Sequence, residues 1–167
     1  ARYRPNGRHS FGLELYSNDI EDLIEFDLAA FELRNIAEAE IRGAELDWEF
    51  QGDRFTLRTA FVKQSAENAA TGERLSRRAE ESMTVKVTKS MGEHRLGLSV
   101  LASGDRADVG GVELDGYVLA NLTAQLALTE RWQLNARIEN LLDEEYETAA
   151  DFRMQARSYF VDLGFEW

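Results

Sequence analysis

The chain has 167 residues, the length of one domain, with a single proline and no cysteine. Thirty-one acidic against nineteen basic residues give a formal net charge of -12, which argues against a nucleic-acid partner, and the lack of cysteine excludes thiolate catalysis. No run of residues approaches the ~20 consecutive apolar residues of a membrane helix, although a membrane barrel strand needs only about 10 alternating residues.

The predicted elements begin with a strand over residues 8–17, extended toward 26, in which Phe11, Leu13 and Leu15 share one face. The next strand covers residues 34–50 and changes phase. Its apolar residues fall on two parities: Ala37, Ala39 and Ile41, then Ala44, Leu46, Trp48 and Phe50. A β-bulge at Gly43-Ala44 is expected to restore one continuous face.

Six further strands are predicted over residues 54–65, 78–90, 93–103, 115–129, 131–141 and 156–167. Each repeats the period of two, which places alternate side chains on opposite faces of a sheet. The last strand carries the alternating series Tyr159, Val161, Leu163, Phe165 and Trp167. The prediction is an all-β fold: an antiparallel up-and-down transmembrane barrel of about eight strands, in one domain or barrel fragment over residues 1–167.

A helical interpretation competes in two places. Residues 19–46 are rich in Ala, Glu and Leu, and two sets of residues recur at helical spacing: Ile20, Leu23, Ile24 and Leu28, then Ile138, Leu141, Leu142 and Tyr146. Intrinsic propensity is a weak guide that tertiary context overrides, and the neighbouring segments all alternate with period two. Strands are therefore favoured in the first region, and a short helical turn near 141–146 is the lesser alternative in the second.

The predicted connections alternate in length. Short turns fall at Pro5-Asn6-Gly7, Gln51-Gly52-Asp53, Met91-Gly92-Glu93 and Thr129-Glu130-Arg131, and long loops fall near 27–33, 66–77, 104–114 and 142–155. All short turns then lie at one end of the sheet, with both termini, and all long loops at the other. Outer-membrane barrels have this asymmetry, with short periplasmic turns and long extracellular loops.

Alternation alone leaves two environments open for the apolar face: lipid, or the interior of a soluble barrel that binds an apolar ligand. Aromatic residues next to the short turns and at the carboxyl terminus favour lipid, because membrane barrels carry aromatic girdles at the interface. These residues are Trp48, Phe50, Phe55, Trp132, Phe165 and Trp167. The opposite face is charged, as in a wetted lumen or an ordinary solvated surface.

The sequence contains no recognisable catalytic or metal-binding pattern. His9 and His94 lack a second histidine at ligand spacing and are expected at the surface, and no Gly-x-Ser-x-Gly accompanies Ser10 or Ser99. Acidic loop residues lack the order of an EF-hand, so solvated charge is expected at Asp105, Asp108, Asp143, Glu144, Glu145, Glu147 and Asp151, with calcium binding left open. No catalytic residue, metal site or cofactor is predicted, and the protein is not expected to be an enzyme.

Several segments carry a family resemblance. IENLLDEEYET (138–148) resembles the penultimate-strand motif of TonB-dependent outer-membrane receptors, and the terminal YFVDLGFEW resembles their closing strand. Successive strands of the same family, above all of its vitamin B12 (cobalamin) receptors, are similar to YSNDIEDLIEFD (16–27), NIAEAEIRGAEL (35–46), LSRRAEESMTVKV (75–87) and LDGYVLANLTAQLALTERWQL (114–134). The similarity runs over nearly the whole chain in order.

The resemblance implies a bacterial outer-membrane barrel of about twenty-two strands with an amino-terminal plug domain. Such a receptor imports cobalamin or chelated iron with energy delivered through TonB, and this chain would supply its last eight strands without the plug and would not transport alone. The chain opens on Ala-Arg-Tyr-Arg-Pro, so it is expected to be mature, trimmed or part of something longer. The alternatives are a self-contained eight-stranded outer-membrane barrel with a structural role and the soluble barrel.

The resemblance also implies roles for two groups of residues. The closing strand is the family's signal for the barrel-assembly machinery, which maps onto Tyr159, Val161, Leu163, Phe165 and Trp167, where the family more often ends in Phe. The penultimate-strand motif maps onto Asn140, Leu141, Asp143 and Tyr146. From their chemistry, Asn and Asp are expected to end the strand by bonding local backbone, and Tyr to anchor a loop. Outer-membrane lipid is the expected partner of the apolar face.

Overall fold

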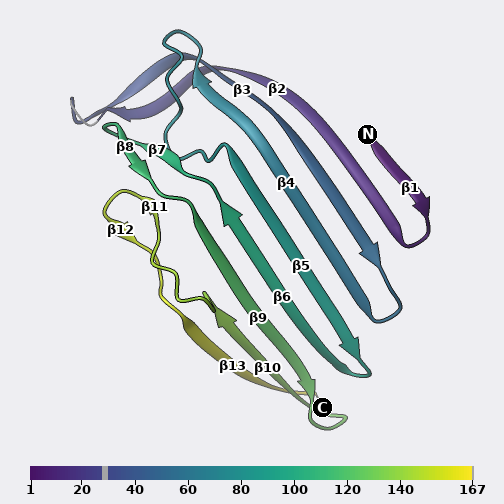
Figure 1. Cartoon of the computed structure of the whole chain (residues 1–167). Coiled ribbons are helices and arrows are strands. Elements are labelled where there is room, and N and C mark those ends of the chain that lie inside the picture. Colours follow the sequence, from purple (N-terminus) through teal and green to yellow (C-terminus); the bar gives the residue numbers. More distant parts are fainter. Residues whose placement is uncertain (28–29, 167) are drawn as a thin grey trace.

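The alternating sequence forms a curved antiparallel sheet in the computed structural model, which describes residues 1–27 and 30–166 (Figure 1). Nine strands follow one another across this sheet: β1 (Arg2–Asn6), β2 (His9–Asp27), β3 (Glu32–Gln51), β4 (Phe55–Asn68), β5 (Glu81–Met91), β6 (His94–Ser103), β9 (Tyr117–Ala127), β10 (Trp132–Glu139) and β13 (Ser158–Phe165). Two small hairpins lie in the loops: β7 (Arg106–Asp108) with β8 (Val112–Leu114), and β11 (Glu147–Ala149) with β12 (Phe152–Arg153). In the described part of the chain, no helix is long and apolar enough to cross a membrane.

The eight predicted strands are confirmed, and a ninth was missed. β1 precedes the first turn and pairs with β2 through Tyr3 opposite Phe11. It contains Pro5, which an edge strand tolerates because one side of its backbone needs no ladder hydrogen bonds. β1 and β13 are the two edges of the sheet, so the sheet is open and the closed eight-stranded barrel considered from the sequence is not what forms.

The predicted bulge at Gly43-Ala44 is wrong. Pairing runs through this point without a shift, and Gly43 lies opposite both Tyr16 and Gln64. A side chain on Gly43 would place a Cβ 2.4 Å from the hydroxyl oxygen of Tyr16, so the absence of a side chain gives the tyrosine its room. The phase change in the sequence therefore marks a change in which face is apolar, not a change of register.

Between Gly43 and the loop end of β3, the apolar side chains of the strand belong to the opposite face of the sheet. Ala39 is buried there against Ala66 and Leu75, with Ile20 and Ile41 packed around them. Leu75 comes from the loop between β4 and β5, so the loop covers this end of the sheet. Ala37, the other residue of the first parity, has a side chain outside the described set.

The helical interpretation is also wrong. β2 and β3 pair from His9 opposite Phe50 to Asp27 opposite Glu32, so the Ala- and Glu-rich region is mostly a long hairpin, and the loop expected near 27–33 is shorter than predicted. Residues 141–142 form a turn, and 143–146 continue as irregular chain. Asp22 takes a positive φ of 56° near the loop end of β2, and the pairing with β3 keeps the same register on both sides of it.

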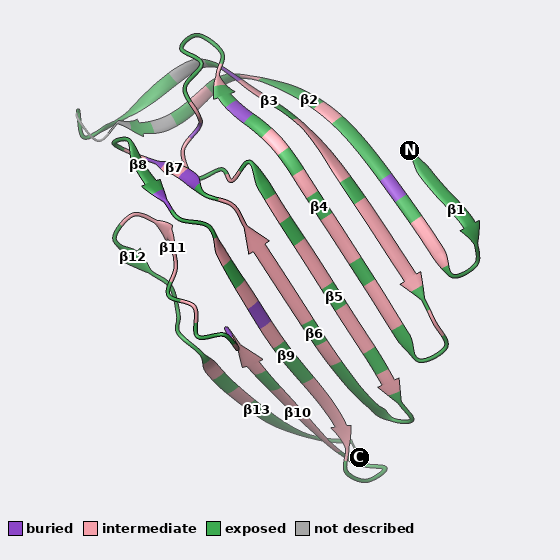
Figure 2. Ribbon diagram, in the orientation of Figure 1, coloured by how far each residue is buried: buried purple, intermediate pink, exposed green. Residues whose placement is uncertain are grey.

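The two ends of the sheet differ as predicted (Figure 1). Short turns at residues 7–8, 52–54, 92–93 and 128–131 share one end, and the long connections 69–80, 104–116 and 140–157 share the other. These three connections are called the loop layer below. Buried residues are few and most of the sheet is half-buried or exposed (Figure 2), so the apolar side chains of the strands are not gathered into a core.

Candidate functional site

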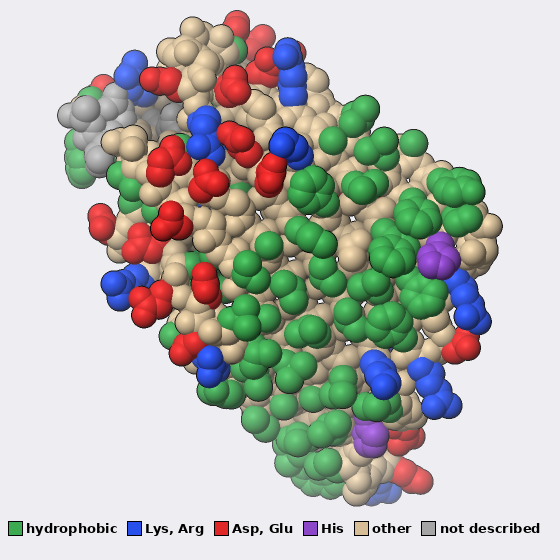
Figure 3. Space-filling model, in the orientation of Figure 1, with side chains coloured by type: hydrophobic (Ala, Val, Ile, Leu, Met, Phe, Trp, Pro, Cys, Tyr) green, Lys and Arg blue, Asp and Glu red, His purple; other side chains and the backbone are tan. Residues whose placement is uncertain are grey.

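One face of the sheet is apolar across neighbouring strands and is called the outer face. Cross-strand pairing sets Phe61 between Leu46 and Met83, and it sets Leu98 between Val87 and Leu122. Figure 3 shows the resulting field of hydrophobic side chains, which covers the strands and stops short of the acidic loop end. A contiguous apolar field of this extent indicates contact with a membrane or a partner.

Aromatic rings border the outer face at the short-turn end. His9 and Phe11 each stack on Trp48, with ring centroids 6.0 and 6.1 Å apart, and the Trp48 indole N–H donates a hydrogen bond to His9 Nδ1 (3.2 Å). Near the opposite edge of the sheet, where β10 pairs with β13, the ring centroids of Trp132 and Phe165 lie 4.8 Å apart. These rings lie where the predicted aromatic girdle places them, and Trp167 lies outside the described residues. His9 thus belongs to a ring cluster, with only part of its surface exposed.

The opposite, inner face is polar. Glu49 accepts a hydrogen bond from Arg58 (3.2 Å), and Arg137 forms an ion pair with Glu139 (3.0 Å). The Tyr16 hydroxyl donates to the Gln64 side-chain oxygen (3.2 Å). Charged side chains that pair within one face while apolar ones fill the other are typical of a barrel wall between lipid and a wet lumen.

The predicted penultimate-strand motif forms the junction between β10 and the following loop. Asn140 is 5% exposed and has a positive φ of 51°, and its backbone N–H donates to Asn121 Oδ1 (2.9 Å). Its side-chain amide donates to the carbonyl oxygens of Glu144 (2.9 Å) and Gln155 (3.2 Å), and Oδ1 accepts from the Glu144 N–H (2.9 Å). One side chain therefore joins both ends of the 140–157 loop.

The other motif residues extend this junction. The Leu141 N–H donates to the Ala120 carbonyl (2.7 Å), and Asp143 Oδ1 accepts from the Arg157 N–H (3.0 Å). The Tyr146 ring packs 4.5 Å from that of Tyr117. Burial raises the pKa of Tyr146, and Tyr117 and Glu139 raise it further, so the phenol stays neutral at physiological pH. These contacts are structural, and none presents a nucleophile or an acid-base pair.

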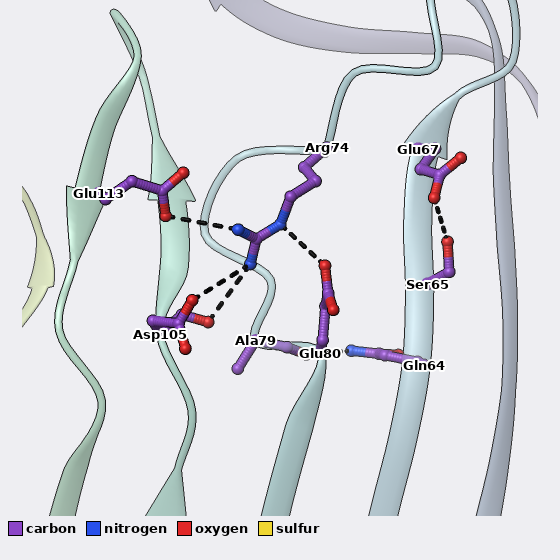
Figure 4. Close-up of polar contacts among 8 residues, drawn as sticks. All are labelled: Gln64, Ser65, Glu67, Arg74, Ala79, Glu80, Asp105 and Glu113. Atoms are coloured by element: carbon purple, nitrogen blue, oxygen red, sulfur yellow. Dashed lines mark hydrogen bonds and ion pairs between the residues drawn. The ribbon is translucent and has the colours of Figure 1, made fainter.

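Arg74 connects two parts of the loop layer (Figure 4). Its guanidinium lies 3.0 Å from a Glu80 carboxylate oxygen, 3.4 Å from one of Glu113 and 3.9 Å from one of Asp105. Glu80 belongs to the same loop as Arg74, whereas Asp105 and Glu113 belong to the 104–116 loop. Nearby, the Gln64 side-chain amide donates to the Ala79 carbonyl (3.0 Å), which ties the loop to β4.

Asp108 connects all three loops. Its Oδ1 accepts from Arg77 Nε and from the Val109 N–H, both at 2.7 Å, and its Oδ2 accepts from the Ala150 N–H. Burial raises the pKa of the Asp108 carboxyl, but the Ala150 N–H, Arg77 and the Val109 N–H outweigh it and hold this pKa below the usual 3.8. The sequence placed Asp108 among solvated loop charges, and the structure corrects this, because the side chain is buried and fully paired.

The lowered pKa predicts how acid affects the loop layer. The carboxylate stabilises the layer at every pH above 3.8, and this contribution is lost as the pH falls through the lower folded-state pKa. Asp108→Asn should remove this acid dependence. It should also speed hydrogen exchange of the Ala150 and Val109 amides at neutral pH by roughly tenfold, which corresponds to a loss of about 1.4 kcal/mol in the free energy of local opening. Exchange mass spectrometry measures both effects. The exposed Asp115→Asn is the matched control, and equal exchange in both variants would contradict the assignment.

Two connections of the loop layer, 104–116 and 140–157, also line an open acidic pocket. Its lining includes Glu113, Asp115, Glu145, Glu147 and Asp151, with Arg153 as the basic member. Among the described residues no group of three or more His, Asp or Glu side chains is placed to hold a metal ion. Sequence reasoning missed Arg74 and Arg77 because they contact the carboxylates of Glu113 and Asp108, which lie 39 and 31 residues away, and only their position in acidic long loops hinted at pairing.

Comparison with protein families finds a match to the model described as TonB dependent receptor-like, beta-barrel, over residues 1–141. The vitamin B12 transporter BtuB of Vibrio vulnificus (strain YJ016) is 32% identical over 161 residues, which cover 93% of this chain and 25% of that protein. BtuB of Vibrio cholerae (strain M66-2) is 26% identical over 160 residues, covering 91% and 26%. The chain spans about a quarter of the length of these curated relatives.

Solved structures share the fold. A mutant of the ferric enterobactin receptor PfeA from Pseudomonas aeruginosa aligns with a TM-score of 0.80 at 17% identity, over 98% of this chain and 29% of that one. The copper transporter OprC aligns with a TM-score of 0.79 at 15% identity, over 99% and 30%. In both alignments the sheet matches about 30% of a longer chain.

Proposed function

The chain belongs to the TonB-dependent receptor β-barrel family, and from this premise we propose that it is the carboxyl-terminal part of the barrel wall of a receptor that imports cobalamin or chelated iron. Proteins of this family are transporters of the bacterial outer membrane and not enzymes. The soluble, ligand-binding barrel considered from the sequence is therefore set aside.

The observation that carries the proposal is the division of the sheet into an apolar outer face and a polar inner face in one continuous register. In a barrel wall, the outer face contacts hydrocarbon and the inner face lines the lumen. The edges at β1 and β13 leave unpaired backbone groups, which favour pairing with further strands of a larger barrel. The plug and the contact with TonB then belong to the full-length receptor, and the chain alone does not transport.

Cobalamin is the favoured ligand because curated relatives across more than 90% of the chain are named vitamin B12 transporters. Chelated iron is the second candidate, supported by structural likeness to a ferric enterobactin receptor. The loop layer is the part of this chain that faces an external ligand, since long loops of outer-membrane barrels are extracellular.

The closing strand is proposed as the signal for the barrel-assembly machinery. Its outer side chains lie on the edge strand and are all exposed: Tyr159 (67%), Val161 (70%), Leu163 (57%) and Phe165 (47%). An edge strand with both an open backbone and an exposed apolar row is chemically suited to recognition by strand pairing. Trp167, the last member of the signal, lies outside the described residues.

Uptake by living cells tests the proposed function. Bacteria that lack their own cobalamin and ferric-chelate receptors would express either the full-length protein or residues 1–167 alone. The full-length protein is expected to support uptake of labelled cyanocobalamin only while TonB is present, and the shorter chain is expected to support none. Uptake of neither cobalamin nor any ferric chelate by the full-length protein, or TonB-independent uptake, would contradict the proposal.

A further inference from the structure

Three basic residues border the outer face at the short-turn end and are called the basic rim: Arg8, Arg54 and Lys89. Lys89 lies on the outer face of β5, opposite Phe55 of β4 and Leu96 of β6. Arg54 immediately precedes Phe55, and its carbonyl accepts the Ser90 N–H (2.8 Å). Arg8 occupies the adjacent turn and forms an ion pair with Asp53 (3.1 Å). The three residues thus come from neighbouring turns and strand ends.

The basic rim carries uncompensated positive charge. All three side chains are exposed, and within residues 1–27 and 30–166 the side chains of Arg54 and Lys89 have no ion-pair or hydrogen-bond partner. Asp53 is paired with Arg8, so Arg54 and Lys89 are the two cations of the rim that have no ion-pair partner among the described residues. This is notable in a chain of net charge -12, whose acidic side chains gather at the loop end in Figure 3.

Aromatic rings lie directly beside this charge. Phe55 is paired with Lys89 in the sheet, and its ring centroid is 6.1 Å from that of Phe50, which in turn lies 4.9 Å from His9. Aromatic rings of this kind mark the boundary between hydrocarbon and headgroups in membrane barrels. Lysine and arginine next to such a boundary place their charges at the depth of lipid phosphates.

We propose that Arg54 and Lys89, assisted by Arg8, bind the phosphate of an anionic glycerophospholipid in the leaflet on the short-turn side of the membrane. The ligand is a lipid and not free phosphate because the rim is continuous with the apolar outer face, which receives the acyl chains. The acidic loop end repels the same headgroup, so the site also favours one insertion depth. This inference rests on the proposed orientation of the outer face toward lipid.

Fluorescence quenching of Trp48 tests the site. The full-length protein, with its other tryptophans changed to Phe, is folded into phosphatidylcholine vesicles that contain an equal fraction of brominated phosphatidylcholine or brominated phosphatidylglycerol. Brominated phosphatidylglycerol should quench more strongly, because the rim enriches it. Since each basic residue near an anionic surface strengthens binding about fivefold, Arg54→Ser with Lys89→Ser should lower this preference by about tenfold or more. Arg95→Ser, a basic position on the inner face at the same end, is the matched control and should leave it unchanged.

The outcomes separate this inference from the proposed function. Equal quenching by the two brominated lipids, or an equal loss of preference in the Arg95→Ser variant, would overturn the lipid site and leave the barrel orientation intact. Quenching by neither lipid would overturn the orientation of the outer face itself. Excess inorganic phosphate should not remove the preference for phosphatidylglycerol, and its removal would contradict a site that needs the acyl chains.

Discussion

Leu98→Arg should lower the free energy of unfolding by about 2–4 kcal/mol, because an arginine near the middle of the lipid-facing wall must be taken into hydrocarbon. Leu98 lies on the outer face of β6 between Val87 and Leu122, within the apolar stretch of that strand and away from both of its ends. Urea titration of the full-length protein in lipid vesicles, followed by tryptophan emission, measures the loss.

Ser99→Arg is the matched control for this variant. Ser99 is the next residue along β6 and faces the lumen between Lys86 and Asn121. A wet lumen solvates the added charge, and repulsion by Lys86 costs under about 1 kcal/mol. Equal losses in the two variants would mean that the two faces of β6 meet the same medium, which contradicts the assignment of faces.

Asn140→Ala should also cost about 2–4 kcal/mol, since it removes three part-buried hydrogen bonds and leaves backbone groups of Glu144 and Gln155 without these partners. Part of the loss comes from the positive φ of 51°, which alanine adopts at a cost of about 1 kcal/mol relative to glycine or asparagine. The unfolding free energy and the exchange rate of the Glu144 amide report the effect.

Asn140→Gly separates the two causes of this loss. Glycine accepts the positive φ but supplies no side-chain hydrogen bonds, so this variant should be less destabilised than Asn140→Ala by about 1 kcal/mol and still weaker than the natural protein. An alanine variant within about 0.5 kcal/mol of the natural protein would show that the junction does not hold the 140–157 loop.

The strands of the sheet were predictable because alternation is a local signal. Leu122 to Leu126 alternate strictly, and Tyr159 to Phe165 alternate apart from Phe160, which lies against Arg137 on the inner face. β1 was missed because its five residues include Pro5 and show little alternation. The phase change in β3 was misread as a bulge, because the burial of Ala39 depends on Leu75 of a distant loop.

The loop layer was the least predictable part of the molecule. Asp108 accepts from Arg77 and from the Ala150 N–H, partners 31 and 42 residues away in the sequence, and no local pattern encodes such contacts. Asn140 was recognised as a motif residue, but its partner Gln155 lies 15 residues on. The chemistry of each residue type indicated that it would bond backbone or charge, whereas the choice of partner required the fold.

Site-directed spin labelling along β9 tests the central claim, that alternate side chains of the sheet contact lipid. These 167 residues contain no cysteine, and any cysteine elsewhere in the full-length protein is replaced by serine, so that single cysteines can be labelled at residues 121–126 in vesicles. Labels at Leu122, Ala124 and Leu126 should collide with lipid-soluble oxygen and avoid a water-soluble nickel chelate, and labels at Asn121, Thr123 and Gln125 should do the reverse. Uniform access of the nickel chelate to all six positions would contradict the account.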